Sequence, residues 1–452
     1  MARHRPPFKN QRLPKIKNGC EREETVPTDG RLAKSAPVSH QDGGLRRAAA
    51  LQGIDPARYR DEHRRMMHFI ATRNVYGVDL NATAVELGSL SLWLGSIHRL
   101  LLRPGENGGQ DVFQSGATPW FGLRLRCGNS LIGARRAVWT TEQLKLGQHV
   151  GKEGAVPRLL KPGEARAHNE VYHFLVFDEE MVPASSDKLM KEFWPERVGV
   201  AKTWLAKQVK PKWKADEIKE SLAVCDLIDE HWRRYAEQRE QALRETECTA
   251  TVWLAPSDSP EAVAPGPSLE IQERIKHELE KTSGSFQRLK LVLDTWCALW
   301  FWPLDGVPDL PTRAGFLASA RLLLGSTPPK PNERSLVSAR VGFEIDALLA
   351  ATPDGEVPDT LLLADAVPWF GHGHALATEQ TLHHWELVFP EVLGPDRLTR
   401  LAGRLARAVR SGQETRPTVD QTTSPAGCAA GSAACRGRGG RRGCRWTTSE
   451  RQ

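Results

Sequence analysis

The chain has 452 residues, 8 cysteines and a formal net charge of +7, and these features exclude several classes of protein. No apolar run approaches the ~20 residues of a membrane-spanning helix, and the basic amino terminus lacks the apolar segment of a secretory signal. Eight cysteines over this length do not make a dense disulfide framework, so we expect a reducing, cytoplasmic location. The mild basic excess suits a nucleic-acid partner and suits an ordinary basic protein equally well.

The first elements are predicted from the periodicity of apolar residues. Residues 1–45 show little periodicity, and we expect them to be disordered or degraded in sequence. A helix is predicted over 56–72. The next stretch, Asn74 to Leu94, reads NVYGVDLNATAVELGSLSLWL. It predicts a buried strand that ends at Asp79, then a turn, then a helix that runs on to residue 101. Asn81 or Thr83 would cap this helix. A carboxylate at the carboxyl end of a parallel strand lies where open α/β sheets bind ligands.

Further strands and helices follow in the chain. Phe121–Cys127 alternates as a half-buried strand does, and Gly128-Asn129-Ser130 turns the chain after it. Val171–Phe177 is predicted as a second strand, and 378–388 is expected to lead into a third. Helices are predicted over 186–246, 268–281, 286–302, 312–324 and 335–349, with a loop or linker at 249–268.

Fourteen tryptophans are many for this length, and two interpretations of them stay open. They could pack helices together in the core, or they could stack on the bases of a nucleic acid. The residues concerned are Trp204, Trp213, Trp232, Trp296, Trp300 and Trp302.

Three stretches resemble the motifs of a known family. They are GVDLN-x-x-AVEL-x-x-x-SLWL from Gly77, LRCGNSLIGA from Leu125, and HHWELVFPEVL from His383. In this order and spacing they resemble large S-adenosylmethionine-dependent adenine-N6 DNA methyltransferases, namely single-chain restriction-modification enzymes and the methylases of BREX and DISARM phage defence. The resemblance covers residues 60–394, with a poorly matched middle.

The resemblance implies an α/β fold, with a partial Rossmann-like methyltransferase sheet, a large, mainly helical insertion and disordered termini. We expect a partial core at 46–180, the helical insertion at 181–350, a return to the core at 351–394, and a disordered basic tail at 395–452. That tail is rich in Gly, Ala, Arg and Cys, and its composition is typical of a reading frame that has shifted out of register.

The resemblance also implies a cofactor site. Asp79 would hold the ribose hydroxyls of S-adenosylmethionine, Leu80 would lie beside it, and Asn129 would lie beside the adenine ring. The alternatives are that Asp79 caps the following helix and that Asn129 only forms a turn. Double-stranded DNA and other subunits of a bacterial defence system would be the partners.

Two elements of the family are missing from the sequence. No Gly-rich D/E-x-x-x-G-x-G segment precedes residue 74, and no Asn-Pro pair is present for the catalytic NPPY motif. We therefore name no catalytic residue and expect an inactive fragment, with a non-catalytic DNA-binding or assembly protein as the alternative. No metal site is expected either, because His372 and His374 lack a third ligand and are predicted to face solvent on a loop.

Overall fold

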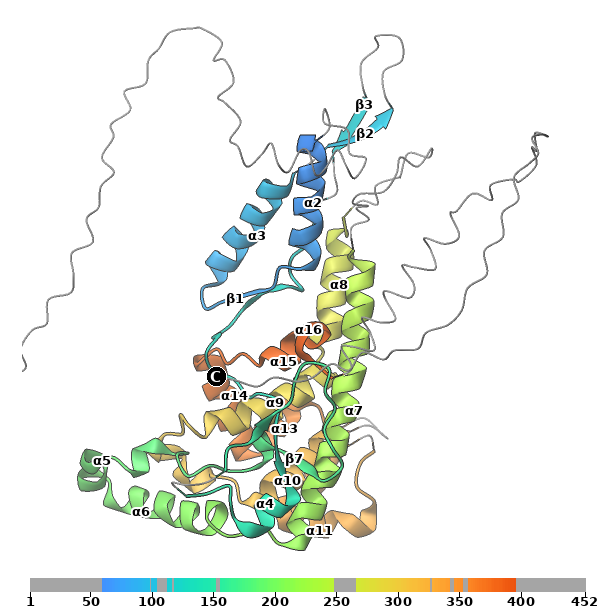
Figure 1. Cartoon of the computed structure of the whole chain (residues 1–452). Coiled ribbons are helices and arrows are strands. Elements are labelled where there is room, and N and C mark those ends of the chain that lie inside the picture. The colour runs from blue at the N-terminus through green and yellow to red at the C-terminus, as the bar shows by residue number, and fades with distance from the viewer. Residues whose placement is uncertain are drawn as a thin grey trace, which may run out of the picture. The chain divides into compact units, whose positions relative to one another are not determined.

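The computed structural model describes residues 59–97, 99–103, 112–115, 118–151, 155–247, 266–325, 327–341, 345–352 and 357–395. These residues are mainly helical, with three small sheets (Figure 1). They form two compact units, one from the described residues of 1–130 and 240–279 and the other from those of 131–239 and 280–452. The expected disordered start at 1–45, the tail beyond Pro395 and nearly all of the linker at 249–268 lie outside the described residues.

The first unit contains a pair of parallel strands, β1 (Gly77–Asp79) and β4 (Leu125–Cys127). Helix α2 (Tyr59–Arg73) packs against α3 (Ala82–Ser96), and α3 packs against both strands. The strand register pairs Gly77 with Leu125 and Asp79 with Cys127, so β1 and β4 end at the same edge. The unit also contains the antiparallel pair β2 (Arg99–Arg103) and β3 (Val112–Ser115), and helix α8 (Leu269–Glu280).

The second unit is a helical assembly around α9 (Ser285–Ala298), in which twelve residues are buried. Helix α7 (Ala215–Glu245), whose residues up to 239 belong to this unit, buries Ile218, Val224, Ile228, Trp232 and Tyr235, which recur at the spacing of one helix face. Helix α14 (Pro368–Glu379) packs closely along α9. Its Gly373 allows this approach, because a Cβ there would lie 2.7 Å from the Thr295 Cα.

The remaining elements of the second unit are short. A three-stranded antiparallel sheet has the order β6–β5–β7, with β5 (Ala137–Thr140), β6 (Arg158–Leu159) and β7 (Glu170–Tyr172). The helices not yet named are α4 (Thr141–Leu146), α5 (Lys188–Phe193), α6 (Pro195–Trp204), α10 (Arg313–Leu324), α11 (Pro331–Val341), α12 (Ile345–Ala350), α13 (Thr360–Ala366), α15 (Trp385–Val388) and α16 (Pro390–Leu393). Single turns add the 3₁₀ helices η2 (His173–Leu175), η3 (Pro183–Ser185) and η5 (Leu304–Asp309), and a π-helical turn, η4 (Leu205–Val209).

The tryptophans of the second unit belong to its core. Trp204, Trp213, Trp232, Trp296 and Trp302 are each at most 8% exposed. Indole N–H groups donate to backbone carbonyls: Trp204 to Pro311 at 2.7 Å and Trp296 to Val176 at 2.8 Å. Trp300 packs edge-on against Trp296, with ring centroids 4.4 Å apart. The helix-packing interpretation of these residues is confirmed.

Several predicted strands are shorter than expected or absent. Residues 121–124 form a turn, and only Leu125–Cys127 is strand. The predicted strand at 171–177 ends at Tyr172 and continues as a 3₁₀ turn. Residues 378–388, which were expected to lead into a strand, contain the end of α14 and helix α15 and are followed by helix α16. Short apolar runs do not distinguish a buried strand from a buried helix, which explains these errors.

Three other expectations from the sequence are corrected. The helix predicted to reach residue 101 ends at Ser96, and Arg99–Arg103 is strand β2. The strand before Asp79 is half-buried, with one strand neighbour among the described residues, and is not a buried central strand. His372 and His374 lie on helix α14 and not on a loop, and His372 Nε2 is 3.0 Å from the Asp309 carboxylate.

Candidate functional site

Asp79 lies at the carboxyl edge of the parallel pair, as the sequence predicts. It is the last residue of β1 and is exposed. Its Oδ1 accepts the Asn81 backbone N–H at 2.8 Å, which orients the carboxylate across the turn. Its backbone carbonyl accepts the Gly128 N–H at 2.9 Å, so the turn after β4 is fastened to the end of β1.

The turn excludes one alternative for Asp79. Asn81 is the cap of α3, because its side-chain oxygen accepts the Thr83 N–H at 2.9 Å. Asp79 therefore does not cap this helix. Its Oδ2 has no protein partner among the described residues, so a ligand hydroxyl could donate to it.

Leu80 and Asn129 lie at the same edge of the pair. Leu80 is 60% exposed, and its carbonyl accepts the Cys127 thiol at 3.3 Å. Asn129 is half-buried and stands two residues beyond Cys127, which is the register partner of Asp79. All three predicted residues therefore lie where two parallel strands end, an edge at which α/β sheets bind ligands.

A cavity on the α3 side of the same unit was not predicted. It has a volume of about 250 Å³, and Trp93, Trp120 and Phe121 give it aromatic walls, with the Glu86 carboxylate nearby. The sequence carried a signal for it, because Glu86, Leu90 and Trp93 recur at the spacing of one helix face. Neither Asp79 nor Asn129 lines this cavity.

In the second unit, the second and third motifs of the resemblance meet each other. The His383 N–H donates to the Ile132 carbonyl at 3.0 Å, and the Ala134 N–H donates to His384 Nδ1 at 2.9 Å. Gly133 fits between them only as glycine, because a Cβ there would overlap the His383 carbonyl. The segments 131–134 and 383–386 are thus packed together although they are far apart in the sequence.

Contacts at both ring nitrogens fix the tautomer of His384. Because Nδ1 accepts the Ala134 amide, the ring proton is on Nε2, which lies 2.9 Å from Asp294 Oδ1. Lys290 Nζ is 2.5 Å from the other Asp294 oxygen, and the His384 and Asp294 side chains are each 2% exposed. Burial alone would raise the pKa of Asp294, but the Lys290 ammonium and the His384 hydrogen bond outweigh it and hold the pKa below its ordinary value.

This buried network positions the segments and does not form a reactive centre. The Cys297 thiol, the nucleophile nearest in sequence, is buried, and burial raises its pKa well above the usual range. Arg135 lies over the outer side of the segment, with its Nε 2.6 Å from the Glu386 carboxylate. The arrangement therefore holds the His384 ring in one orientation within the core.

The described residues show neither a metal site nor a membrane span. They contain no group of three or more His, Cys, Asp or Glu side chains that could hold a metal ion. Every described helix is too short or too polar to cross a bilayer. Comparisons with protein-family models, with curated proteins and with solved structures each gave no match. The functional assignment therefore depends on the three sequence motifs and on the geometry at Asp79 and Asn129.

Proposed function

We propose that the β1–α3–β4 segment binds the adenosine part of S-adenosylmethionine, and that the chain derives from the adenine-N6 DNA methyltransferases that its motifs resemble. The observation that carries the proposal is the position of Asp79 and Asn129 at one carboxyl edge of two parallel strands. In such folds the acid accepts hydrogen bonds from ribose hydroxyls. Double-stranded DNA, and other subunits of a bacterial defence system in the cytoplasm, would be its partners.

The residues at this edge suit adenosine in three respects. Asp79 offers an oriented carboxylate with one oxygen open, and a charge-assisted hydrogen bond to a hydroxyl is stronger than a neutral one. The side chain of Leu80 is exposed beside it and offers an apolar surface for a base. Asn129 carries both a donor and an acceptor, the combination that reads the edge of an adenine ring. S-adenosylmethionine would supply an activated methyl group when bound there.

Methyl transfer by this chain alone is not part of the proposal. The family holds the adenine amine with the Asn side chain and a Pro carbonyl of NPPY, and no Asn-Pro pair occurs in the sequence. We propose that the chain binds the donor weakly and that another polypeptide would supply the acceptors for the amine. Methyl transfer to DNA by the purified chain would contradict this part of the proposal.

The test is binding of S-adenosylhomocysteine, measured by titration calorimetry. Wild type should bind, and Asp79→Asn should bind about 10- to 100-fold more weakly, because a hydrogen bond to a charged group contributes roughly 1.5–3 kcal/mol. Asp365→Asn is the matched control, since Asp365 is an exposed acid on α13 in the other unit. Adenosine should compete with the ligand, and methionine should not.

Two outcomes would reject the proposal. One is equal affinity of wild type and Asp79→Asn, and the other is no binding by the folded wild-type chain. Equal competition by methionine and adenosine would place the site elsewhere. Far-UV circular dichroism of each variant is recorded before titration. A variant whose spectrum matches that of wild type is folded, so its affinity reports on the site and not on a folding defect.

An assembly protein without methyltransferase activity is the second candidate, and the surface of α3 favours it. Leu87 and Leu94 are each 57% exposed and Ile97 is 43% exposed, although α3 is apolar around most of its circumference. Such helices are normally covered, and an exposed apolar patch of this kind marks an interaction surface. Leu87→Lys with Leu94→Lys should then abolish self-association in light scattering, and a monomeric wild type would exclude self-assembly.

A further inference from the structure

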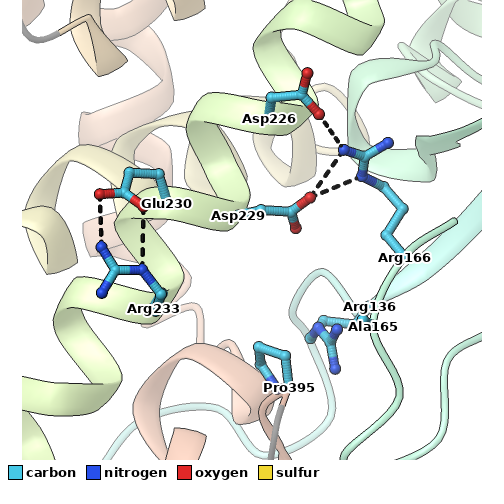
Figure 2. Close-up of a pocket in the computed structure, with 8 residues that line it drawn as sticks. All are labelled: Arg136, Ala165, Arg166, Asp226, Asp229, Glu230, Arg233 and Pro395. Atoms are coloured by element: carbon cyan, nitrogen blue, oxygen red, sulfur yellow. Dashed lines mark hydrogen bonds and ion pairs between the residues drawn. The ribbon is translucent and has the colours of Figure 1, made fainter. Parts of the chain in front are cut away.

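A second cavity lies in the other unit, away from any residue assigned above. It has a volume of about 310 Å³, close to the lower end of the roughly 300–1,000 Å³ of small-molecule sites. Its lining comes from the residue before β5, from the loop between β6 and β7, from helix α7 and from Pro395 beyond the end of α16 (Figure 2). The residues are Arg136, Ala165, Arg166, Asp226, Asp229, Glu230, Arg233 and Pro395.

Backbone hydrogen bonds hold the walls of this cavity in place. The Leu160 N–H donates to the Arg136 carbonyl at 2.8 Å. The Gly163 N–H donates to the Gly394 carbonyl at 3.0 Å, so the β6–β7 loop is joined to the residue before Pro395. The cavity is therefore preformed by the fold, and a ligand would not have to order its walls.

The charges on the α7 wall are already paired with one another. Figure 2 shows the Arg166 guanidinium paired with both Asp226 and Asp229. The closest N–O distances are 2.5 Å to Asp226 and 2.9 Å to Asp229. The Tyr172 hydroxyl donates to the other Asp229 oxygen. Glu230 is joined to Arg233 at 2.7 Å on the same helix. Two carboxylates thus share one guanidinium at Arg166, which leaves about one negative charge on that wall.

Arg136 is the one lining charge that forms no ion pair with a described carboxylate. It is 1% exposed, and its Nη2 donates to the Glu164 carbonyl at 2.8 Å. Its Nε and Nη1 have no acceptor among the described residues. The Trp232 ring, 5.6 Å from its Cζ, offers only partial compensation. A buried cation without a counter-charge is costly, so this position is suited to an incoming anion.

We propose that this cavity binds a small organic carboxylate that carries a positively charged donor, as an α-amino acid does. The carboxylate would neutralise Arg136, and the ammonium would face the Asp226–Asp229 wall, where the Asp226 side chain is 76% exposed and has an oxygen open to a ligand. This charge pattern disfavours a phosphate dianion, because one uncompensated guanidinium faces a wall that is negative in sum. The proposal is independent of the adenosine site, which lies in the other unit.

The experiment titrates the full chain with glycine, acetate and inorganic phosphate and follows binding by ligand-observed NMR. Glycine should bind more tightly than acetate, and acetate more tightly than phosphate. Arg136→Met should weaken glycine binding about 10- to 100-fold, since it removes a charge-assisted contact and keeps the length of the side chain. Arg136→Lys keeps the charge and should weaken glycine binding less.

A second variant keeps the proposal testable if the Arg136 variants do not fold. Asp226→Asn alters an exposed residue and should weaken glycine binding severalfold while acetate binding stays the same or tightens. The proposal is overturned if glycine does not bind, if phosphate binds most tightly, or if Asp226→Asn affects glycine and acetate equally. Asp79→Asn should leave glycine binding unchanged, which separates this result from failure of the adenosine site.

Discussion

Replacing Gly373 by alanine should destabilise the second unit, even though alanine is the better helix former. Gly373 lies within α14, where that helix crosses α9. A Cβ at this position would lie 2.7 Å from the Thr295 Cα and 2.9 Å from its Cβ. These atoms belong to the backbone or are directly attached to it, so one helix would have to shift to make room.

The size of the effect follows from two opposing contributions. Alanine in a helix interior is favoured over glycine by about 0.8–1 kcal/mol. Overpacking a buried contact costs about 1–3 kcal/mol, and contact with backbone atoms favours the upper part of that range. The net expectation for Gly373→Ala is a loss of about 1–2 kcal/mol in the free energy of unfolding.

Gly199→Ala is the matched control. Gly199 lies in α6, is exposed, and a Cβ there would meet nothing within 4 Å. The same substitution should therefore raise the free energy of unfolding by about 1 kcal/mol. Urea unfolding followed by tryptophan fluorescence reports on this unit, whose core contains Trp204, Trp232 and Trp296. A Gly373→Ala midpoint at or above that of Gly199→Ala would refute the close crossing of α9 and α14.

Three further predictions concern ionisable side chains. Burial raises the pKa of the Cys225 thiol to about 12 and raises that of Cys297 further, whereas Cys127 is exposed. Brief alkylation of the native chain, mapped by mass spectrometry, should therefore label Cys127 and leave Cys225 and Cys297 intact. Burial lowers the pKa of His173 from 6.5 to about 4, so unfolding takes up a proton, and stability should be full above pH 6.5 and should fall as the pH drops toward 4. His173→Gln should flatten that slope in urea midpoints, and an unchanged slope would contradict the assignment. Asp294→Asn leaves the partly exposed Lys290 without its ion-pair partner and should lower the free energy of unfolding by about 1–3 kcal/mol. An unchanged midpoint would show that the pair is neutral to stability.

Helices with a long repeating pattern could be predicted closely from the sequence. The stretch 186–246 was predicted to be helical, and its longest helix, α7 (Ala215–Glu245), forms there because one apolar face repeats over many turns. The strand, turn and helix around Asp79 were also predicted, since Asn81 provides a local capping signal. These elements are specified by residues close together in the chain.

Segments whose partners are distant in the chain could not be predicted in the same way. Residues 378–388 were expected to lead into a strand, but His383 and His384 form hydrogen bonds to the loop 131–134 and the chain continues as helix α15. The cavity at Arg136 has no local pattern either, because its walls come from separate segments between residues 136 and 395. Contacts between distant segments determine both the helix after His384 and the cavity at Arg136, and the periodicity of apolar residues carries no information about such contacts.

The hydrogen bond from the Ala134 backbone N–H to His384 Nδ1 also has a consequence for folding kinetics. It joins residues 250 positions apart, and closing a loop of that length costs about 5 kcal/mol of chain entropy. Such a contact is unfavourable until the intervening helices have formed and shortened the effective loop. It should therefore form after the folding transition state, so that weakening it speeds unfolding and leaves the refolding rate nearly unchanged. The buried hydrogen bond between Ala134 and His384 therefore contributes to how long the second unit stays folded, and not to how fast it folds.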